Sequence, residues 1–521
     1  MFLLFISDKQ YFFYEYWIAK KQHKWYYILI YYQAKNKLLK YSEFASIPKK
    51  RINIVGVPGA GKTTFICELS GRLNDEKLLY LSFGRENTKN AMSKLPSNVT
   101  ALSFHAFSKR QMKIESKRIS PRYTMNIVNS SLQSIKVRDL SPAQIEAITL
   151  LMEDFCMSSQ GINKLPSMLQ HNRYPRMNKD ELKKTVISFN TLWNAIWAEG
   201  SNHLVTHDMY LKRLSMIQVR IPYQRIFIDE TQDLNDAMVS LVNNIAASNP
   251  NTQIVRLGDP CQQIFGFRGA SSEFANSQFD FRLQKTHRFG RSLADFCNAI
   301  MNDQRVGYYT NITSDNDKTE VYKTPTIKHL TSMIKNGRKV TYIARYNASL
   351  FNLIKHLAEH GITYSALGDS HHQEMKYYKS LYQLMKGKRF RVGPFANHSY
   401  RTFYNASVQH DDRQAILACQ FVESINEQGE EIFDKLEKLY VEKGKAQVLL
   451  TTIHQAKGME FRHLVVSGDL PECFDHEKQK IISTSREDLH LIYTAITRAK
   501  ESIALPRSLF KYYEKSVLKI R

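Results

Sequence analysis

One stretch, residues 51 to 71, constrains the fold more than any other part of the chain. It reads RINIVGVPGAGKTTFICELSG: an apolar run typical of a buried strand, a glycine-rich turn and a helix-forming segment. Glycines carry no Cβ, so the backbone can wrap closely around an anion, and the N–H groups at a helix start present partial positive charge to it. The stretch therefore predicts a loop that cradles the phosphates of a nucleotide. A glycine-rich turn without a ligand is the alternative, and the flanking strand and helix argue against it.

The spacing gives individual side chains of this loop their roles. In the pattern G-x-x-x-x-G-K-[ST], the lysine, here Lys62, reaches the β- and γ-phosphates, and the hydroxyl of the next residue, Thr63, ligates Mg²⁺. A nucleoside triphosphate and Mg²⁺ are therefore expected at this loop, and the family resemblance described below implies ATP. The candidate nucleotide-binding residues of the loop are Gly56, Gly59, Gly61, Lys62, Thr63 and Thr64.

Strands and helices are expected to alternate after this loop. KLLYLSF at 77–83 reads as a second buried strand, and ALSFHAF at 101–107 as another short strand that enters a turn. Such alternation predicts a parallel, doubly wound sheet. From about 108 to 205 the pattern changes to helical segments with many basic residues and no convincing strand, which indicates an inserted helical subdomain. Its basic stretch is either a solvated helix face or a nucleic-acid contact.

A second chemical signal lies at residues 225–233, RIFIDETQD. An apolar strand here delivers two adjacent carboxylates to its carboxyl end. This arrangement places Asp229 where it can hold Mg²⁺, directly or through water, and Glu230 where it can orient or deprotonate the attacking water. Acidic pairs after apolar strands also arise by chance, but this pair follows a phosphate loop and continues into Gln232 and Asp233.

The charge balance favours a polyanionic partner. A chain of 521 residues is long for one core, so two or more domains are expected. The formal net charge is +24, and clustered Lys and Arg release counterions when they meet phosphates. A Lys-, Asn-, Ile- and Tyr-rich coding bias is the other explanation of this charge. Six scattered cysteines without a C-x-x-C pair indicate neither a zinc site nor a disulfide framework, so an intracellular, reducing compartment is expected.

The first 47 residues alternate aromatic and apolar runs with polar breaks. No run approaches the roughly 20 apolar residues of a membrane-spanning helix, and the segment lacks the features of a signal or transit peptide. We expect residues 1–47 to form an accessory N-terminal extension or an upstream stretch outside the functional core, and we expect no membrane partner.

Seven segments, in order, carry a resemblance to a known family: GVPGAGKTT, SFHAF, IDETQD, GDPCQQIFGFRGA, LQKTHRFG, TTIHQAKGMEF and LIYTAITRAK. They resemble the helicase motifs of the UvrD/Rep type of superfamily 1, over about residues 50 to 505. The segments GDPCQQIFGFRGA and HRFG are most similar in sequence to the F-box DNA helicase branch, although no F-box is evident.

The resemblance implies an α/β fold of two RecA-like P-loop NTPase domains, each with a parallel sheet, and with helical insertions. The implied first domain covers 48–285 with its helical insert at about 108–205, and the second covers 286–521 with a reduced insert at about 370–445.

Local patterns place further elements in the second domain. Residues 339–345 read as a strand, 361–368 as a further strand and turn, and 375–387 as a helix that stops at a glycine. Residues 487–500 read as a helix that presents an arginine. His371 and His372 have no ligand partners at metal spacing, so both are expected at the surface.

The resemblance also implies roles for residues beyond the loop. Gln262 matches the glutamine that senses the γ-phosphate, and Arg288 and Arg498 match two arginines that reach this phosphate from the second domain. The expected catalytic set is Glu230, Gln262, Arg288 and Arg498. Guanidinium groups brought in by domain closure neutralise charge on the phosphoryl oxygens, which couples hydrolysis to closure.

The adenosine side of the site departs from the family pattern. Glu460 matches the residue that contacts the ribose, and His287 stands where a tyrosine usually stacks on adenine. The glutamine that reads adenine upstream of the loop has no clear counterpart, with Gln33 the nearest candidate. Strictness for adenine nucleotides is therefore open.

Six residues fall in motifs that line the strand-binding groove of the family. Aromatic faces there stack on successive bases whatever the base, although packing in the core is the alternative for the phenylalanines. The family commonly has tryptophan at one of these positions, Phe267. The candidate nucleic-acid residues are Phe83, His105, Phe265, Phe267, Thr452 and His454.

The implied function is an ATP-dependent DNA helicase or translocase that moves 3′ to 5′ on single-stranded DNA, in DNA repair, recombination or replication. Single-stranded DNA and single-strand/double-strand junctions are the expected partners, with a nuclease or a replication factor as a candidate protein partner. A translocase that displaces proteins or powers a partner nuclease without unwinding is one alternative. A non-catalytic nucleic-acid-binding scaffold is another, and an RNA strand stays open because stacking does not read the 2′-OH.

Overall fold

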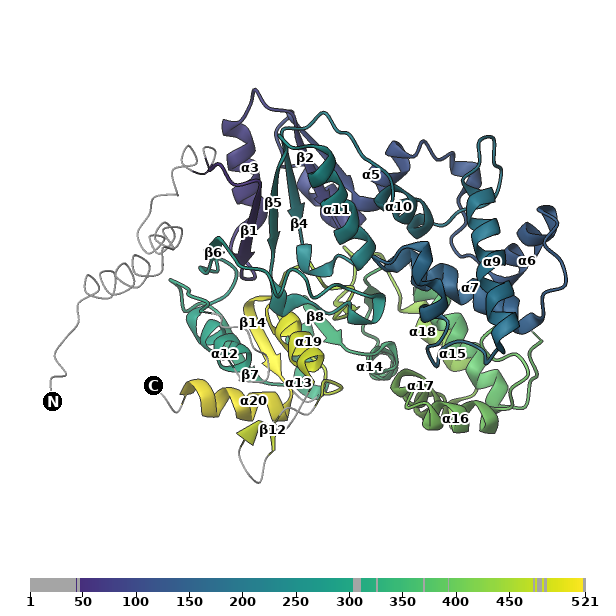
Figure 1. Cartoon of the computed structure of the whole chain (residues 1–521). Helices are drawn as coiled ribbons and strands as arrows, with labels where there is room; N and C mark the ends of the chain where they lie inside the picture. Colours follow the sequence, from purple (N-terminus) through teal and green to yellow (C-terminus); the bar gives the residue numbers. More distant parts are fainter. Residues whose placement is uncertain are drawn as a thin grey trace, which may run out of the picture. The chain divides into compact units, whose positions relative to one another are not determined.

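The computed structural model describes residue 44 and residues 47–302, 311–324, 327–368, 371–391, 393–471, 474–475, 480–481 and 485–518. The proposed extension at residues 1–47, apart from Phe44 and Ile47, lies outside these residues, as does Gln33. The chain divides into two units (Figure 1). The first comprises Met1–Val57 with Gly61–Leu283, and the second Pro58–Ala60 with Gln284–Arg521.

The first unit is built on a six-stranded parallel sheet in the order β3-β2-β4-β5-β1-β6. Its inner strands are mostly apolar, and every residue of β2 and β4 is buried, as expected for a parallel sheet covered on both faces. The strands are β1 (Arg51–Gly56), β2 (Leu78–Ser82), β3 (Val99–Ser103), β4 (Arg225–Asp229), β5 (Gln253–Gly258) and β6 (Phe281–Leu283).

Helices alternate with these strands, and the expectation of a parallel α/β fold is confirmed. The helices that connect or follow the strands are α3 (Lys62–Arg72), α4 (Arg85–Met92), α5 (Phe104–Gln111), α10 (His207–Ser215) and α11 (Asp236–Ser248). Because all strands run in one direction, their carboxyl ends meet at one edge, where ligands of open α/β sheets bind. The loops that follow β1 and β4 leave the sheet at that edge.

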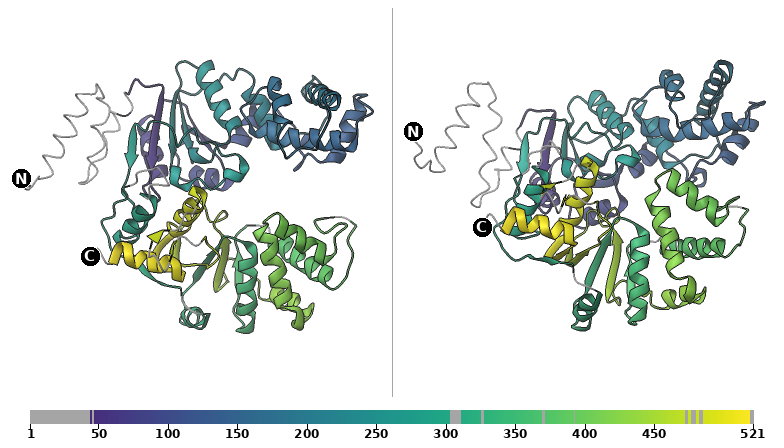
Figure 2. Two further views of the ribbon diagram at one scale, coloured as in Figure 1. Left: turned by 60° about the horizontal axis from the view of Figure 1, so that its bottom comes forward. Right: turned by 90° about the horizontal axis from the view of Figure 1, so that it is seen from below.

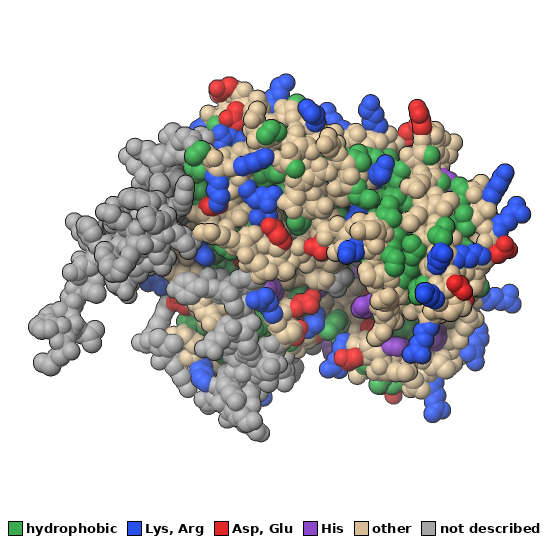
Figure 3. Space-filling model, in the orientation of Figure 1, with side chains coloured by type: hydrophobic (Ala, Val, Ile, Leu, Met, Phe, Trp, Pro, Cys, Tyr) green, Lys and Arg blue, Asp and Glu red, His purple; other side chains and the backbone are tan. Residues whose placement is uncertain are grey.

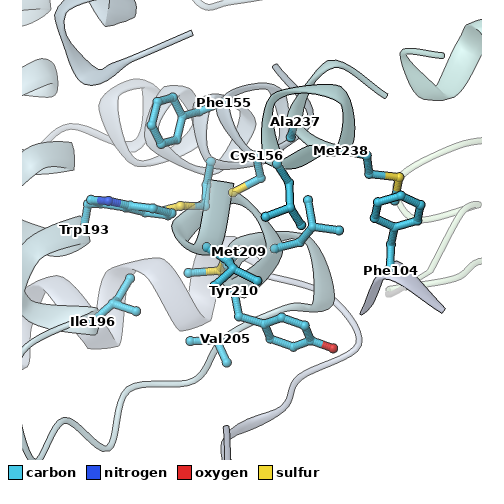
Figure 4. Close-up of a cluster of buried hydrophobic side chains, with 14 of the residues drawn as sticks. Phe104, Phe155, Cys156, Trp193, Ile196, Val205, Met209, Tyr210, Ala237 and Met238 are labelled. Atoms are coloured by element: carbon cyan, nitrogen blue, oxygen red, sulfur yellow. The ribbon is translucent and has the colours of Figure 1, made fainter. Parts of the chain in front are cut away.

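A helical segment is inserted in the sequence of the first unit between α5 and α10. It contains α6 (Met125–Ser134), α7 (Pro142–Met157), α8 (Leu165–Met168) and α9 (Lys179–Ile196). Capping boxes start α7 at Ser141 and α9 at Asn178. Figure 4 shows how the segment joins the core: Phe155 and Trp193 meet edge to face, 5.2 Å between ring centroids, in the same buried cluster as Met209 of α10.

The second unit has its own six-stranded parallel sheet, in the order β7-β14-β11-β8-β10-β9. A short antiparallel pair, β12 (Phe474–Asp475) and β13 (Lys480–Ile481), stands apart from it. The strands of the sheet are β7 (Glu320–Lys323), β8 (Val340–Ala344), β9 (Tyr364–Ala366), β10 (Val448–Thr452), β11 (Phe461–Val466) and β14 (Ala499–Leu505).

Helices surround this second sheet, and four of them form the segment between β9 and β10. Figure 2 shows these four helices, in green, gathered beside α14. They are α15 (His371–Met385), α16 (Tyr400–Gln409), α17 (Arg413–Ser424) and α18 (Glu431–Lys438). The other helices of the unit are α12 (Arg291–Met301), α13 (Ile327–Lys335), α14 (Asn347–Glu359), α19 (Arg486–Ile496) and α20 (Arg507–Tyr513). Among the helices of the described residues, none has the length and apolar character needed to cross a membrane.

Two local predictions are wrong. The strand expected at 101–107 ends at Ser103, and helix α5 begins at Phe104, because the Ser103 hydroxyl accepts a hydrogen bond from the Ala106 N–H (3.2 Å) and caps the helix. The helix expected at 487–500 ends at Ile496. After a turn at 497–498, β14 begins at Ala499; it lies between β7 and β11, and the sequence pattern missed it.

The expectation of a surface position is also wrong for His371. Its side chain is buried and stacks on Tyr440, with 4.1 Å between ring centroids. Burial first, and the neighbouring His372 second, lower the pKa of His371 to about 4. The lack of metal-ligand spacing did not predict how His371 packs, because its aromatic neighbours Tyr364 and Tyr440 come from β9 and from the segment after α18.

Candidate active site

The loop between β1 and α3 has the backbone that a phosphate cradle requires. Gly59 and Gly61 adopt left-handed conformations, with φ of 74° and 78°. A Cβ at Gly56 would lie 2.8 Å from Lys62 Cγ, so only glycine fits beneath this side chain. Lys62 Nζ folds back and donates to the Gly56 carbonyl (2.9 Å). Gly61 is the N-cap of α3, so no side chain covers the helix start.

The carboxylate at the end of β4 is held by two donors. Asp229 is 5% exposed; its Oδ1 accepts from the Glu230 N–H (3.0 Å) and its Oδ2 from the Tyr80 hydroxyl (2.8 Å). Burial, and then the charge of Glu230, raise the pKa of Asp229 to about 6, and the nearby Lys62 opposes this shift. The predicted metal ligand and the predicted phosphate-binding lysine therefore share one electrostatic environment.

The second carboxylate is positioned by a polar relay. Glu230 has a left-handed backbone (φ 54°), and its Oε2 accepts a 2.6 Å hydrogen bond from Gln232 Nε2. Gln232 Oε1 accepts from the Asp259 N–H (3.0 Å), and Asp259 Oδ2 accepts from Gln262 Nε2 (2.7 Å). The segment after β4 is thus hydrogen-bonded to the segment after β5, and Glu230 and Gln262 lie at the two ends of the relay.

Close packing at Gly258 keeps this relay in place. A Cβ there would lie 2.4 Å from Gln232 Oε1 and 2.8 Å from Phe274 Cε1. The last residue of β5 must therefore be glycine for the amide of Gln232 to reach both of its partners.

In the second unit, Arg288 and Glu460 are paired. Arg288 Nε donates to Glu460 Oε2 (3.2 Å) and its NH1 to the Thr497 carbonyl (2.9 Å), while Lys500 Nζ donates to Glu460 Oε1 (2.8 Å). Burial by itself would raise the pKa of Glu460, but the hydrogen bonds and charges of Lys500 and Arg288 outweigh it and lower that pKa. His287, next to Arg288, has an exposed side chain, and its N–H donates to the carbonyl of Gly59, which is grouped with this unit (2.9 Å).

Arg498 is only 2% exposed and lies in the turn between α19 and β14 rather than on a helix. Its Nε donates to the Thr494 carbonyl (3.0 Å) and its NH1 to the Met459 carbonyl (3.3 Å). The guanidinium thus joins the end of α19 to the segment before β11.

The candidate nucleic-acid residues of the first unit lie partly exposed after their strands. Phe83 and Phe265 contact one another, with 5.6 Å between ring centroids and 30° between ring planes. The Arg268 guanidinium lies 5.7 Å from the Phe265 centroid, and His105 Nε2 lies 3.0 Å from Asp208 Oδ1. The side chain of Phe267 lies outside the described part of the structure.

The remaining two candidates belong to the second unit. Thr452 is the last residue of β10 and is buried, while His454 is partly exposed in the segment that follows. The structure thus brings Phe83 and Phe265 together, and it places Thr452 and His454 on one connecting segment.

The sequence reasoning missed several members of the site. Tyr80 and Asp259 were not singled out, and Gln232 was noted without a role. For Asp259 a signal existed, because it follows an apolar strand as Asp229 does. For Tyr80 none existed, because its contact depends on which strands are neighbours.

The donors present fit ATP and Mg²⁺. An open helix start, glycines in left-handed conformations and a lysine beside the loop suit phosphates. A buried carboxylate whose two oxygens each accept one donor keeps lone pairs for a hard cation or its water ligands, as Mg²⁺ prefers.

Comparison with known proteins agrees with this geometry. Residues 40–280 match the model of the UvrD/REP helicase N-terminal domain. The chain is 25% identical to F-box DNA helicase 1 of Gallus gallus over 508 residues, which cover 88% of this chain and 47% of that protein. It is 23% identical to F-box DNA helicase protein 1 of Schizosaccharomyces pombe (89% and 56% covered) and 24% identical to the ATP-dependent DNA helicase PcrA of Leuconostoc citreum (53% and 40% covered).

The chain spans about half the length of the curated relatives it matches. The matched model covers strands β1 to β5 of the first sheet with the phosphate loop and the paired carboxylates, and the two F-box helicases match most of both units. The chain is thus similar to the UvrD/REP helicase N-terminal domain over residues 40–280 and to the F-box DNA helicases over most of its length.

Proposed function

We propose that this chain is an ATP-driven motor that moves on single-stranded DNA and unwinds duplex DNA. One observation carries the proposal: the relay of hydrogen bonds that joins Asp229, Glu230, Gln232, Asp259 and Gln262 at the carboxyl edge of the sheet whose first strand ends in the phosphate loop. A scaffold that only binds nucleic acid has no need of such a hydrogen-bonded set, of which all members except the partly exposed Glu230 are buried. The names of the relatives, which are DNA helicases, support the same function.

We assign the nucleotide site as follows. Gly56, Gly59, Gly61 and Thr64 form the cradle, Lys62 binds the β- and γ-phosphates, and Thr63 and Asp229 hold Mg²⁺. Bound Mg²⁺ would neutralise charge on the phosphates. Glu230 orients the attacking water and accepts its proton. Gln262, at the far end of the relay, hydrogen-bonds the γ-phosphate, so its position depends on Glu230 through Gln232 and Asp259.

The second unit supplies the groups that complete hydrolysis. We propose that Arg288 and Arg498 stabilise the transferring phosphoryl group, that Glu460 contacts the ribose and that His287 stacks on the base. In this structure Arg288 is bound to Glu460 and the Thr497 carbonyl, so the arginine has to exchange these partners for phosphate. That exchange gives nucleotide binding a direct effect on the second unit. The two units are thus proposed as two RecA-like domains, 48–285 and 286–521.

Single-stranded DNA is the proposed track. Phe83, Phe265 and Phe267 would stack on bases in the first unit, beside His105, while Thr452 and His454 would contact the strand in the second. Figure 3 shows Lys and Arg side chains spread over many elements of one face, with fewer Asp and Glu, which suits contact with a phosphate backbone. The proposed direction is 3′ to 5′.

A strand-displacement assay tests the proposal. Duplexes with a 3′ tail, a 5′ tail or no tail are mixed with the protein and ATP, with Glu230→Gln as the matched inactive control. We expect unwinding of the 3′-tailed duplex only, and none by the control.

The same protein is tested on single strands that carry a bound protein block. Displacement of the block without duplex unwinding would replace the helicase proposal by the translocase alternative. Failure in both assays, with normal DNA binding, would favour the scaffold.

A further inference from the structure

Tyr80 hydrogen-bonds Asp229 although it belongs neither to the phosphate loop nor to the segments after β4 and β5. It lies on β2, which pairs in parallel with β4, so that Tyr80 is opposite Phe227 and Ser82 is opposite Asp229. Its ring is completely buried, and its hydroxyl donates to Asp229 Oδ2 (2.8 Å). A neighbouring strand thus sends a rigid donor to the carboxylate that we assign to Mg²⁺.

The two donors fix the rotation of the Asp229 carboxyl group. The terminal torsion of an aspartate is broad by itself, so a carboxylate without partners has no single orientation. Here the Glu230 N–H holds Oδ1 and the Tyr80 hydroxyl holds Oδ2. Each oxygen keeps one further lone-pair direction, and these two directions are fixed in space.

Tyr80 is suited to this task because it cannot move away. A buried aromatic ring packed in a parallel sheet has one rotamer, whereas a water molecule in the same place could exchange. Partners of this kind, which orient a metal ligand without touching the metal, affect metal affinity strongly.

We propose that Tyr80 is a positioning residue for metal binding: its hydroxyl holds the Asp229 carboxylate in the orientation that binds Mg²⁺ together with the nucleotide. The inference rests on the proposed nucleotide site and adds a residue to it that the sequence motifs do not contain. Tyr80 contacts neither nucleotide nor water in this account and acts only through Asp229.

The test uses Mn²⁺ in place of Mg²⁺, because bound Mn²⁺ is counted directly by electron paramagnetic resonance. Mn²⁺ affinity is measured with a non-hydrolysable ATP analogue for the wild type, Tyr80→Phe and Tyr364→Phe. The last variant is the matched control, since Tyr364 is also a fully buried strand tyrosine whose hydroxyl is hydrogen-bonded, to the Leu436 carbonyl (3.1 Å), but in the second unit.

We expect Tyr80→Phe to weaken Mn²⁺ binding about tenfold, while the affinity for the analogue in EDTA stays within about twofold of the wild type. The Mg²⁺ concentration that half-saturates ATP hydrolysis should rise by the same factor. Tyr364→Phe should change neither. Mn²⁺ affinity in Tyr80→Phe within about twofold of the wild type would overturn the inference.

A second comparison separates positioning from general damage to the fold. In an Asp229→Ala background the oriented carboxylate is gone, so adding Tyr80→Phe should cause no further loss of Mn²⁺ affinity. A further loss in the double variant would mean that Tyr80 acts by another route and would also overturn the inference. If the wild type itself binds the analogue without any Mn²⁺ dependence, the proposed nucleotide site fails rather than the role of Tyr80.

Discussion

Replacing Gln232 by alanine is the sharpest single test of the relay, because its amide joins Glu230 to Asp259 and so links the segments after β4 and β5. Nε2 donates to the Glu230 carboxylate (2.6 Å) and Oε1 accepts from the Asp259 N–H (3.0 Å), and the residue is 1% exposed. The first bond is charge-assisted and is worth about 1.5–3 kcal/mol. Removing the second leaves a buried N–H without a partner, which costs about 1–3 kcal/mol.

Losing the bond to Glu230 should lower both kcat and the free energy of unfolding, whereas losing the bond to the Asp259 N–H should lower only the free energy of unfolding. The bond to Glu230 acts on the water-orienting carboxylate, so its loss should lower kcat for ATP hydrolysis by about 10- to 150-fold, since each 1.36 kcal/mol is tenfold. Both bonds contribute to stability, so the free energy of unfolding should fall by about 2.5–6 kcal/mol. The affinity for ATP should change little, because Gln232 does not touch the phosphates.

The assays are steady-state ATP hydrolysis and urea unfolding of the same preparations. Gln144→Ala is the matched control: Gln144 is also buried and hydrogen-bonded, to the Ser141 N–H (3.0 Å) and the Glu181 carbonyl (3.1 Å), but in the helical segment of α7 and α9. The control should lose stability and keep kcat. A folded Gln232→Ala protein with kcat within about threefold of the wild type would refute the relay as a catalytic device.

The remaining predictions concern the phosphate loop, the catalytic carboxylate and a buried histidine. Lys62→Ala should reduce ATP hydrolysis to background in a phosphate-release assay, because it removes the amine that binds the β- and γ-phosphates. Glu230→Gln should retain unhydrolysed ATP on filter binding; near-normal turnover would contradict its role. The lowered pKa of His371 means that the unfolded chain binds more protons between about pH 4 and 6.5, so stability should fall with acidity through this window, by about 1–2 kcal/mol from pH 7 to 5. His371→Phe, which keeps the ring stack on Tyr440, should flatten this slope in urea unfolding; an unchanged slope would contradict the assignment.

Much of the architecture follows from local patterns in the sequence. Continuous apolar runs predict β2, β4 and β8 to within two residues, because inner strands of a parallel sheet are buried on both faces and are therefore rich in apolar residues. The phosphate loop is equally local, since its glycines and Lys62 act through spacing along the chain. Elements with mixed patterns were harder: β14 begins with AKES, and the sheet that buries it is assembled from strands distant in sequence.

The site shows the same division between local and distant contacts. Motif spacing placed Asp229, Glu230 and Gln262, but not the bridge of Gln232 between segments that follow two different strands. The contact of Tyr80 with Asp229 follows from strand order alone. Contacts that depend on tertiary neighbours leave no periodic signal in one sequence.

ATP hydrolysis by the purified chain, with and without single-stranded DNA, tests the central claim most directly. Rates are measured over a salt series, with Lys62→Ala as the control for contaminating activity. A coupled motor should hydrolyse ATP faster when DNA is added, and this stimulation should fade as salt rises, because phosphate contacts release counterions. ATP hydrolysis that DNA does not stimulate at any salt concentration would contradict the account. So would a hydrolysis rate no higher than that of Lys62→Ala.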